Sequence, residues 1–206
     1  MRRKLKIEVF ADIICPWCFI GKKRLEKALL ERPEIDVSID WRCFLLNPSI
    51  PQNGIDRKQY LLTKFGHAAS SVYSRIEQAG KESGINFKFD AIKKTPDSRS
   101  VHELIIAAGE NGYELSELFY QAYFLKGKDI SDTIIQKEII ESSEIEQVFE
   151  PKKIHAAKKI LESDLSQANL LGIDGVPFFI FNNQMSLAGA HPEHILLTAI
   201  DTTITN

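Results

Sequence analysis

The sequence predicts an α/β fold in which a helical block is inserted into a small sheet domain. Three observations support this prediction. A strand–helix–strand pattern opens the chain, a strand–strand–helix pattern closes it, and helical periods dominate between them. We therefore expect residues 1–55 and 172–206 to form one domain around a sheet, and residues 56–171 to form an inserted helical domain.

The first pattern predicts two parallel strands joined by a helix. Apolar and charged residues alternate over residues 5–9 and again over residues 35–41, which is the period of a half-buried strand. Between them, one apolar stripe predicts a helix from about Pro16 to Glu31. A connection of this kind is a right-handed crossover. Cys43 has the parity of the apolar side of the second strand, so we expect it to be a small buried residue.

Helical periods separated by Gly, Pro and Asn fill the middle of the chain. We expect helices at residues 56–65, 68–83, 95–111, 115–127, 131–139 and 151–171, and a short extended piece at residues 86–89. The last part predicts a strand at residues 175–181, a hairpin turn at Asn182-Asn183, a returning strand at residues 184–188 and a final helix at residues 193–203.

The segment Cys15-Pro16-Trp17-Cys18 lies where the first strand is followed by the helix. Pro16 suits the first helical turn, where a missing N–H is not needed. The helix N-terminus carries a partial positive charge, which favours a thiolate over a thiol. Because the thiolate is the reactive form of cysteine, a CxxC pair at a helix start is typical of a redox site. We expect Cys15 to be the nucleophile and Cys18 to resolve the mixed disulfide.

Two other interpretations of the cysteine pair remain open. A CxxC pair is also half of a zinc site. Zinc usually needs four ligands, whereas the chain offers only one more cysteine, Cys43, and five scattered histidines. We therefore predict no metal. The pair could also be buried and inert, but Pro16 and Trp17 between the cysteines predict a shaped, exposed loop.

Composition indicates an ordinary globular protein and excludes some classes of partner. Of the 206 residues, 44% are hydrophobic and 26% are charged, and the net charge is −2. This balance gives no electrostatic case for binding nucleic acid or a membrane surface. Lys6, Glu8 and Asp12 interrupt the start of the chain, so we expect no signal peptide. We expect a cytoplasmic protein, because three cysteines form no structural disulfide framework.

The order of elements, with CxxC after the first strand and Gly175-Val176-Pro177 near the second strand pair, indicates a thioredoxin fold. With its helical insertion, the chain resembles the DsbA-like thioredoxin family. Four segments resemble the FrnE branch of that family, whose cytosolic members are described as thiol–disulfide oxidoreductases. They are residues 12–22 (DIICPWCFIGK), Asn47-Pro48, Ala122-Tyr123-Phe124 and residues 175–179 (GVPFF). The resemblance covers essentially the whole chain.

The resemblance implies roles for residues near the two cysteines. Pro177 matches the family's cis-proline, which lies beside the CxxC pair. A cis bond there would turn the backbone groups of Val176 outward, where an extended peptide could pair with them. Pro16, Trp17, Val176 and Pro177 are therefore the predicted substrate-binding residues. A trans proline at a strand start is the alternative for Pro177, and Trp17 could instead cover the insertion.

Three more residues are left with open roles. Asp12 could accept the proton that Cys18 loses, or it could cap the loop. His102 and His191 match the family pattern only in part. We expect each of these histidines to be a surface or packing residue rather than a base.

These observations predict a thiol–disulfide oxidoreductase of the oxidase or isomerase type, acting on protein or small thiol substrates. The chain has no nucleotide-binding glycine motif, so we expect no tightly bound cofactor, and glutathione or a partner protein as redox partner. The alternative is a glutathione-dependent enzyme of the 2-hydroxychromene-2-carboxylate isomerase or kappa-class transferase type, which resembles this chain but has a serine at the position of Cys15. A third possibility is a binding module with a vestigial CxxC pair. The sequence leaves the oligomeric state open.

Overall fold

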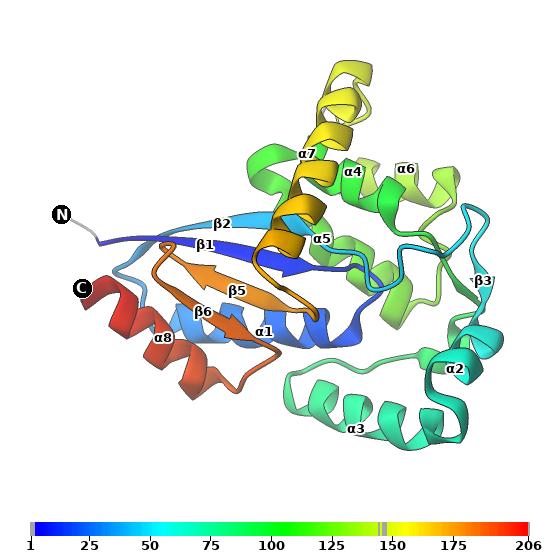
Figure 1. Cartoon of the computed structure of the whole chain (residues 1–206), viewed down its shortest axis with the longest axis horizontal. Coiled ribbons are helices and arrows are strands. Elements are labelled where there is room, and N and C mark those ends of the chain that lie inside the picture. Colours follow the sequence, from blue (N-terminus) through cyan, green and yellow to red (C-terminus); the bar gives the residue numbers. More distant parts are fainter. Residues whose placement is uncertain (1–2, 144, 146–147, 206) are drawn as a thin grey trace.

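The computed structural model describes residues 3–143, 145 and 148–205. The described residues form a four-stranded sheet in the order β2-β1-β5-β6 (Figure 1). The strands are β1 (Lys4–Ala11), β2 (Asp36–Cys43), β5 (Phe178–Phe181) and β6 (Met185–Ala188). β1 and β2 are parallel, whereas β5 is antiparallel to both of its neighbours. The expected strand pairs and parallel crossover are thus present.

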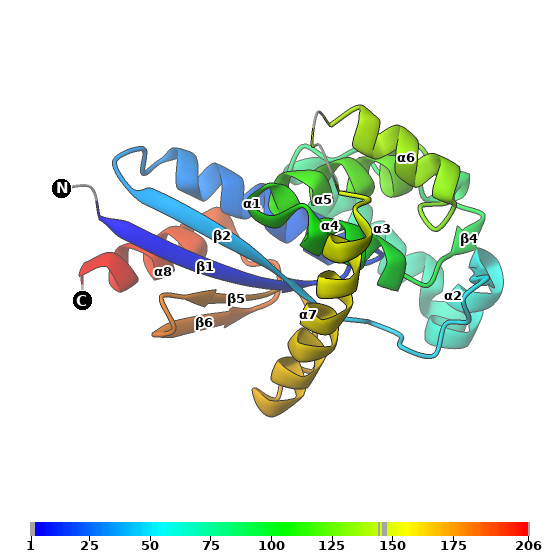
Figure 2. The same ribbon diagram turned by 90° about the horizontal axis from the view of Figure 1, so that it is seen from above.

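One face of the sheet is covered by two helices, α1 (Pro16–Leu30) and α8 (Glu193–Thr205) (Figure 2). The strands alternate as predicted, because Leu5, Ile7 and Val9 are buried in the core that also contains Leu196 of α8. This alternation fixes which side of β1 faces the helices. It also delivers the chain after β1 to the start of α1.

The hairpin between β5 and β6 turns at Asn182 and Asn183, as expected. Both residues have positive φ, 48° and 56°. Asparagine tolerates this left-handed conformation better than most residues, and two such residues in succession suit the twist of a tight hairpin.

The helical block lies beside the sheet (Figure 1). Its helices are α2 (Arg57–Phe65), α3 (Ala69–Glu82), α4 (Arg99–Ala107), α5 (Gly112–Tyr120), α6 (Thr133–Glu141) and α7 (Pro151–Leu170), with short 3-10 turns at Gly66–Ala68, Phe89–Ala91 and Gly109–Asn111. A cluster of aromatic rings joins this block to α1. Phe19 of α1 stacks on Tyr120 with ring centroids 5.0 Å apart, and its ring edge meets Phe87 at 6.1 Å.

Helix α7 contacts both α4 and β2. Ala168, near its C-terminal end, packs with Phe10 on the sheet face opposite α1 and α8. Leu161 packs with Cys43 at the end of β2. Helix α7 therefore contacts both the helical block and the sheet. The domain boundary between residues 171 and 172 remains a prediction.

Two local expectations were wrong, and one helix differs from the expectation only in its last turn. Residues 55–56 and 94–95 pair as a second, two-stranded sheet of β3 (Ile55–Asp56) and β4 (Lys94–Thr95) where we expected helix starts. Residues 86–88 belong to no strand within the described part of the chain, and Phe89 begins a 3-10 turn. The helix expected to end near residue 127 does end there, but its last turn, Gln121–Leu125, is a π-helix. The pairing of β3 with β4 depends on contact between distant segments, which local periodicity does not record.

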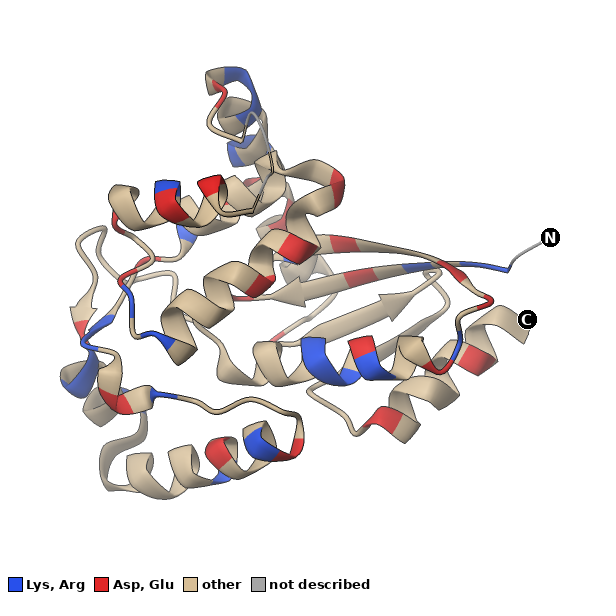
Figure 3. Ribbon diagram, turned by 180° about the vertical axis from the view of Figure 1, so that it is seen from behind, with Lys and Arg blue, Asp and Glu red and all other residues tan. Residues whose placement is uncertain are grey.

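Charges are mixed along the molecule. Lys and Arg positions and Asp and Glu positions are both scattered over the sheet and the helices (Figure 3), in keeping with the net charge of −2. In the described part of the chain, no helix has both the length and the apolar character needed to cross a membrane.

Candidate redox site

The two cysteines lie at the start of α1. Cys15 is the N-cap residue, with an extended backbone (φ −94°, ψ 113°), and Pro16 opens the helix. The carbonyl of Cys15 accepts hydrogen bonds from the backbone N–H groups of Cys18 (3.1 Å) and Phe19 (3.4 Å). The sulfur of Cys15 therefore sits at the positive end of the helix, as the sequence predicts.

Cys15 and Cys18 are free thiols that interact with each other. Burial raises the pKa of the Cys18 thiol well above its ordinary value, and its hydrogen bond with Cys15 raises that pKa further. Ionisation of Cys18 is therefore unfavourable while Cys15 is an unreacted partner. A thiol that resists ionisation in this way suits a resolving cysteine, which reacts second.

The expectation of an exposed loop between the cysteines was wrong. Cys15 is only 3% exposed and Cys18 only 2% exposed. Pro16 is buried, and Trp17 is half-buried against the core. The aromatic cluster that packs on the first turn of α1 explains this burial, because it joins the helical block to that turn.

The segment before β5 lies against the cysteine pair. The Val176–Pro177 peptide bond is cis, as the family resemblance implied. The thiol of Cys15 donates to the carbonyl oxygen of Val176, with sulfur and oxygen 3.6 Å apart. The buried ring of Pro177 lies over Gly21 of α1, where a Cβ atom would come within 2.8 Å of Pro177 Cγ. The structure thus brings Cys15, Cys18, Val176 and Pro177 together.

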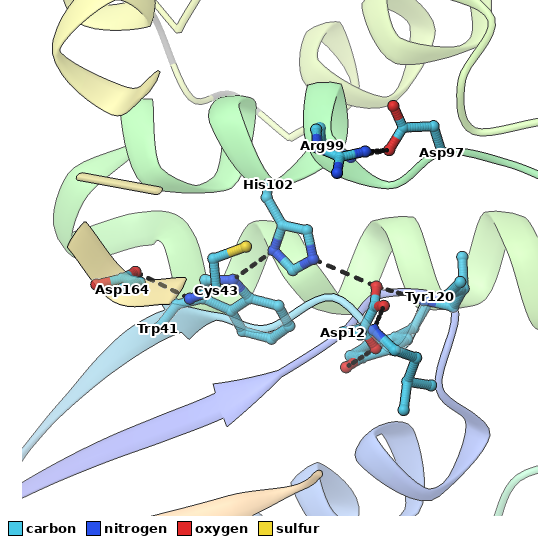
Figure 4. Close-up of polar contacts among 10 residues, drawn as sticks. Asp12, Trp41, Cys43, Asp97, Arg99, His102, Tyr120 and Asp164 are labelled. Atoms are coloured by element: carbon cyan, nitrogen blue, oxygen red, sulfur yellow. Dashed lines mark hydrogen bonds and ion pairs between the residues drawn. The ribbon is translucent and has the colours of Figure 1, made fainter. Parts of the chain in front are cut away.

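Asp12 connects the cysteine pair to the rest of the protein (Figure 4). Its side chain is fully buried. Among the described residues, its carboxylate accepts hydrogen bonds from the backbone N–H groups of Ile14 (3.3 Å) and Leu46 (2.8 Å) and lies 3.3 Å from Nε2 of His102. These contacts include the loop-capping role that the sequence left open.

The backbone of Asp12 contacts the site directly. Its carbonyl accepts hydrogen bonds from the N–H of Cys15 (3.0 Å) and from the hydroxyl of Tyr120 (3.2 Å). Its backbone also offers a hydrogen bond that lowers the pKa of Cys18, although this effect is smaller than burial. Tyr120 had not been predicted as a site residue, because its only sequence signal is an apolar helical position.

His102 is fully buried, so it is not the surface residue that was one expectation. Its Nδ1 accepts a hydrogen bond from Nε1 of Trp41 at 3.2 Å. His191 is half-buried and lies apart from this network, with its backbone N–H bonded to Gly189. The two histidines therefore differ, and only His102 joins the site.

Cys43 is fully buried, as predicted. Burial raises the pKa of its thiol well above the ordinary value, and the nearby carboxylates of Asp12 and Asp164 raise it further. Its backbone N–H donates to Asp164 at 2.9 Å. No group of three or more His, Cys, Asp or Glu side chains in the described part of the chain could hold a metal ion.

A pocket of about 310 Å³ lies beside the segment that Asp12 holds. Leu46, whose N–H binds the Asp12 carboxylate, forms part of its wall. The remaining lining residues come from the segment after β2, from β3 and from α2. They are Asn47, Ile55, Gln59, Tyr60, Thr63 and Lys64.

A family model described as the DSBA-like thioredoxin domain matches residues 6–201. The chain belongs to this family. The DSBA-like family assignment agrees with the predicted fold, whereas the closer resemblance to the FrnE branch remains a prediction.

The uncharacterized protein YwbO of Bacillus subtilis (strain 168) is 28% identical over 142 residues, which cover 66% of this chain and 64% of that relative. The match therefore spans less than two thirds of the relative's length.

Solved structures share the DSBA-like fold. A probable DsbA oxidoreductase from Streptomyces coelicolor superimposes with a TM-score of 0.82 at 24% identity, covering 97% of this chain and 89% of that one. The cytosolic disulfide reductase DsbM from Pseudomonas aeruginosa, solved with GSH, has a TM-score of 0.68 at 14% identity over 98% and 100%. A 2-hydroxychromene-2-carboxylate isomerase has a TM-score of 0.68 at 12% identity over 96% and 95%. At these identities the likeness establishes the fold alone.

Proposed function

We propose that this protein is a thiol–disulfide oxidoreductase that exchanges a Cys15–Cys18 dithiol or disulfide with its substrates. The observation that carries the proposal is the pairing of the two thiols at the start of α1, with the Cys15 sulfur 3.6 Å from the Val176 carbonyl. A thiol at a helix start is suited to attack, and its buried neighbour is suited to react second.

The reaction proceeds by two displacements. The Cys15 thiolate attacks one sulfur of a substrate disulfide, forms a mixed disulfide and releases the other sulfur as a thiolate. The Cys18 thiol then loses its proton and attacks Cys15, which forms the Cys15–Cys18 bond and releases the second substrate thiolate. Two electrons pass from the dithiol to the substrate. The reverse sequence oxidises a substrate dithiol.

Substrates reach Cys15 from the side of the Val176 carbonyl, an acceptor for the backbone N–H of an extended peptide. Because Cys15 is only 3% exposed, a bound substrate must displace neighbouring side chains. Half-buried Trp17 is the side chain that we expect to move. Protein and small-molecule disulfides both fit this scheme. Glutathione is the proposed redox partner, and the cytoplasm the proposed location, in line with the cytosolic reductase DsbM and its GSH.

A trapping experiment tests the proposal. Cys18→Ser should accumulate a mixed disulfide with oxidised glutathione, because no second thiol releases it, whereas Cys15→Ser should trap none. Cys43→Ser is the matched control and should behave like the unmodified protein, because Cys43 is fully buried and packs with Leu161 rather than with the pair. Mass spectrometry of the intact protein measures the adduct. Equal trapping by the Cys15 and Cys18 variants would contradict the assigned roles.

The same variants separate this function from glutathione-dependent isomerisation or transfer. Dithiol exchange requires Cys18, so Cys18→Ser should abolish turnover of insulin or oxidised glutathione. An isomerase or transferase needs no second cysteine and would be insensitive to this change. The reduction potential of the pair, measured against glutathione, assigns the direction of electron flow.

A further inference from the structure

The buried pair of His102 and Asp12 lies next to the reactive dithiol, yet neither side chain forms or breaks a bond in the exchange described above. We infer that His102 is a positioning residue: by donating a hydrogen bond to Asp12, it stabilises a buried negative charge beside Cys18 and so restrains Cys18 from ionising. The inference rests on the proposed function, since it assigns His102 a role within dithiol exchange.

The hydrogen bonds of His102 assign its tautomer. The indole N–H of Trp41 can only donate, so Nδ1 of His102, 3.2 Å away, must be the acceptor. A neutral imidazole then carries its proton on Nε2. Nε2 lies 3.3 Å from Oδ1 of Asp12, and the proton therefore points at the carboxylate (Figure 4). Trp41 thus fixes His102 as a donor to Asp12.

The His102 donor and the Asp12 carboxylate to which it donates are buried together. Both His102 and Asp12 are fully buried. A carboxylate in such a site keeps its negative charge only when hydrogen-bond donors replace water. The backbone N–H groups of Ile14 and Leu46 supply part of this replacement, and His102 supplies the contribution from a side chain.

The charge of Asp12 acts on Cys18. It is among the causes that raise the pKa of the Cys18 thiol, after burial and the two effects of Cys15. The effects of Cys15 depend on its free sulfur, and they end when Cys15 enters a mixed disulfide. Three effects then remain: burial and the Asp12 charge, which raise the pKa of Cys18, and the hydrogen bond from the Asp12 backbone, which lowers it. His102 contacts the carboxylate, so the charge is the part of this balance that His102 controls.

Other titratable groups face this region from neighbouring elements. Tyr120 of α5 faces Cys18, Cys15 and Asp12, Tyr73 of α3 faces Cys15, Cys43 of β2 faces Asp12, and Asp164 of α7 faces His102. Burial raises the pKa of Tyr120, Tyr73 and Cys43 above their ordinary values, so these groups stay neutral near pH 7. They add no charge there that would mask the effect of Asp12. The remaining group, Asp164, is paired with Arg42 and accepts from the backbone N–H of Cys43.

A two-phase reaction with Ellman's reagent tests the inference. Cys15 attacks the aromatic disulfide and releases one thionitrobenzoate, and Cys18 then attacks Cys15 and releases the second. Stopped-flow absorbance from pH 5 to 10 gives the midpoint of the second phase. His102→Leu removes the donor to Asp12, which makes the buried charge less stable. We expect its midpoint to fall by about one pH unit, so that the second phase is about tenfold faster at pH 7.

Two further variants separate positioning from packing. His102→Gln keeps an N–H donor and should restore the midpoint of the unmodified protein. Asp12→Asn removes the charge itself and should lower the midpoint as His102→Leu does. The double variant should show no further shift, because both changes remove one effect. An unchanged midpoint in His102→Leu, or additive shifts in the double variant, would overturn the inference.

His102→Phe tests the inference if His102→Leu does not fold. It keeps an aromatic ring in place but removes the Nε2 donor to Asp12, so its midpoint should also fall. An unchanged midpoint would overturn the inference. Failure of the proposed function looks different: the unmodified protein would then release no second thionitrobenzoate at any pH.

Discussion

Gly21 of α1 lies directly beneath the ring of Pro177, so close that a Cβ atom there would come within 2.8 Å of Pro177 Cγ and 3.2 Å of Phe179 Cζ. The helix that carries the cysteines and the segment that faces them are in contact at this point. The absence of a side chain at residue 21 is therefore a condition for bringing Cys15 to the Val176 carbonyl.

Gly21→Ala should destabilise the protein and slow the reaction of Cys15. The added methyl group forces α1 and the Pro177 segment apart, at a cost of about 1–3 kcal/mol for an overpacked core. This cost exceeds the gain of about 1 kcal/mol that alanine brings inside a helix. Urea denaturation and the first phase with Ellman's reagent measure the two effects. Gly175→Ala is the matched control, because a Cβ atom there meets no atom within 4 Å.

The two buried tyrosines of α5 give a second prediction. The hydroxyl of Tyr120 donates to the Asp12 carbonyl at 3.2 Å, whereas that of Tyr113 has no hydrogen-bond partner among the described residues. Tyr120→Phe should therefore lower the free energy of unfolding by about 1 kcal/mol. Tyr113→Phe should be neutral or stabilising, because it removes a polar group that is not satisfied. Equal losses in the two variants would show that the bond to Asp12 contributes nothing.

The raised pKa of Cys43 predicts a sensitivity to alkaline pH. Its thiol stays protonated in the folded protein above its ordinary pKa near 9.0, while the unfolded chain loses that proton. Rising pH therefore stabilises the unfolded state, and the free energy of unfolding that is present below pH 9.0 is progressively lost above it. Each such thiol contributes a slope of about 1.4 kcal/mol per pH unit.

Cys43→Ser tests this sign. Denaturation of the reduced protein between pH 8 and 10 should show a shallower fall in stability for the variant, because one titrating thiol has been removed. Cys18 makes the same contribution to the pH dependence of stability in both proteins, so the difference between the two proteins reports Cys43. A parallel fall in the two proteins would mean that Cys43 ionises equally in the folded and unfolded states.

Much of the sheet could be predicted, because each strand shows its own alternation of apolar and polar residues. The alternation around Ile7 and the Asn182-Asn183 turn are local signals, and the pairing of β1 with β2 follows from them. The pairing of β3 with β4 could not be predicted, since Ile55 and Thr95 become neighbours only in the folded chain. The cysteine pair could be predicted for the same reason as the strands, because its spacing and its position before a helix are recorded within one short segment of sequence.

The surroundings of the pair could not be predicted. Trp41 and His102 lie 61 positions apart, and each alone is an ordinary core residue. The burial of Cys15 also escaped prediction, because it depends on aromatic rings from the helical block. Sequence patterns thus located the two candidate cysteines, whereas the groups that surround them became visible only in three dimensions.

Asp12 is held by groups from four stretches of the chain: its own loop, the segment after β2, α4 and α5. Grafting residues 15–18 onto the start of another helix would therefore transfer the two sulfur atoms without the hydrogen-bonding groups that hold Asp12 beside them.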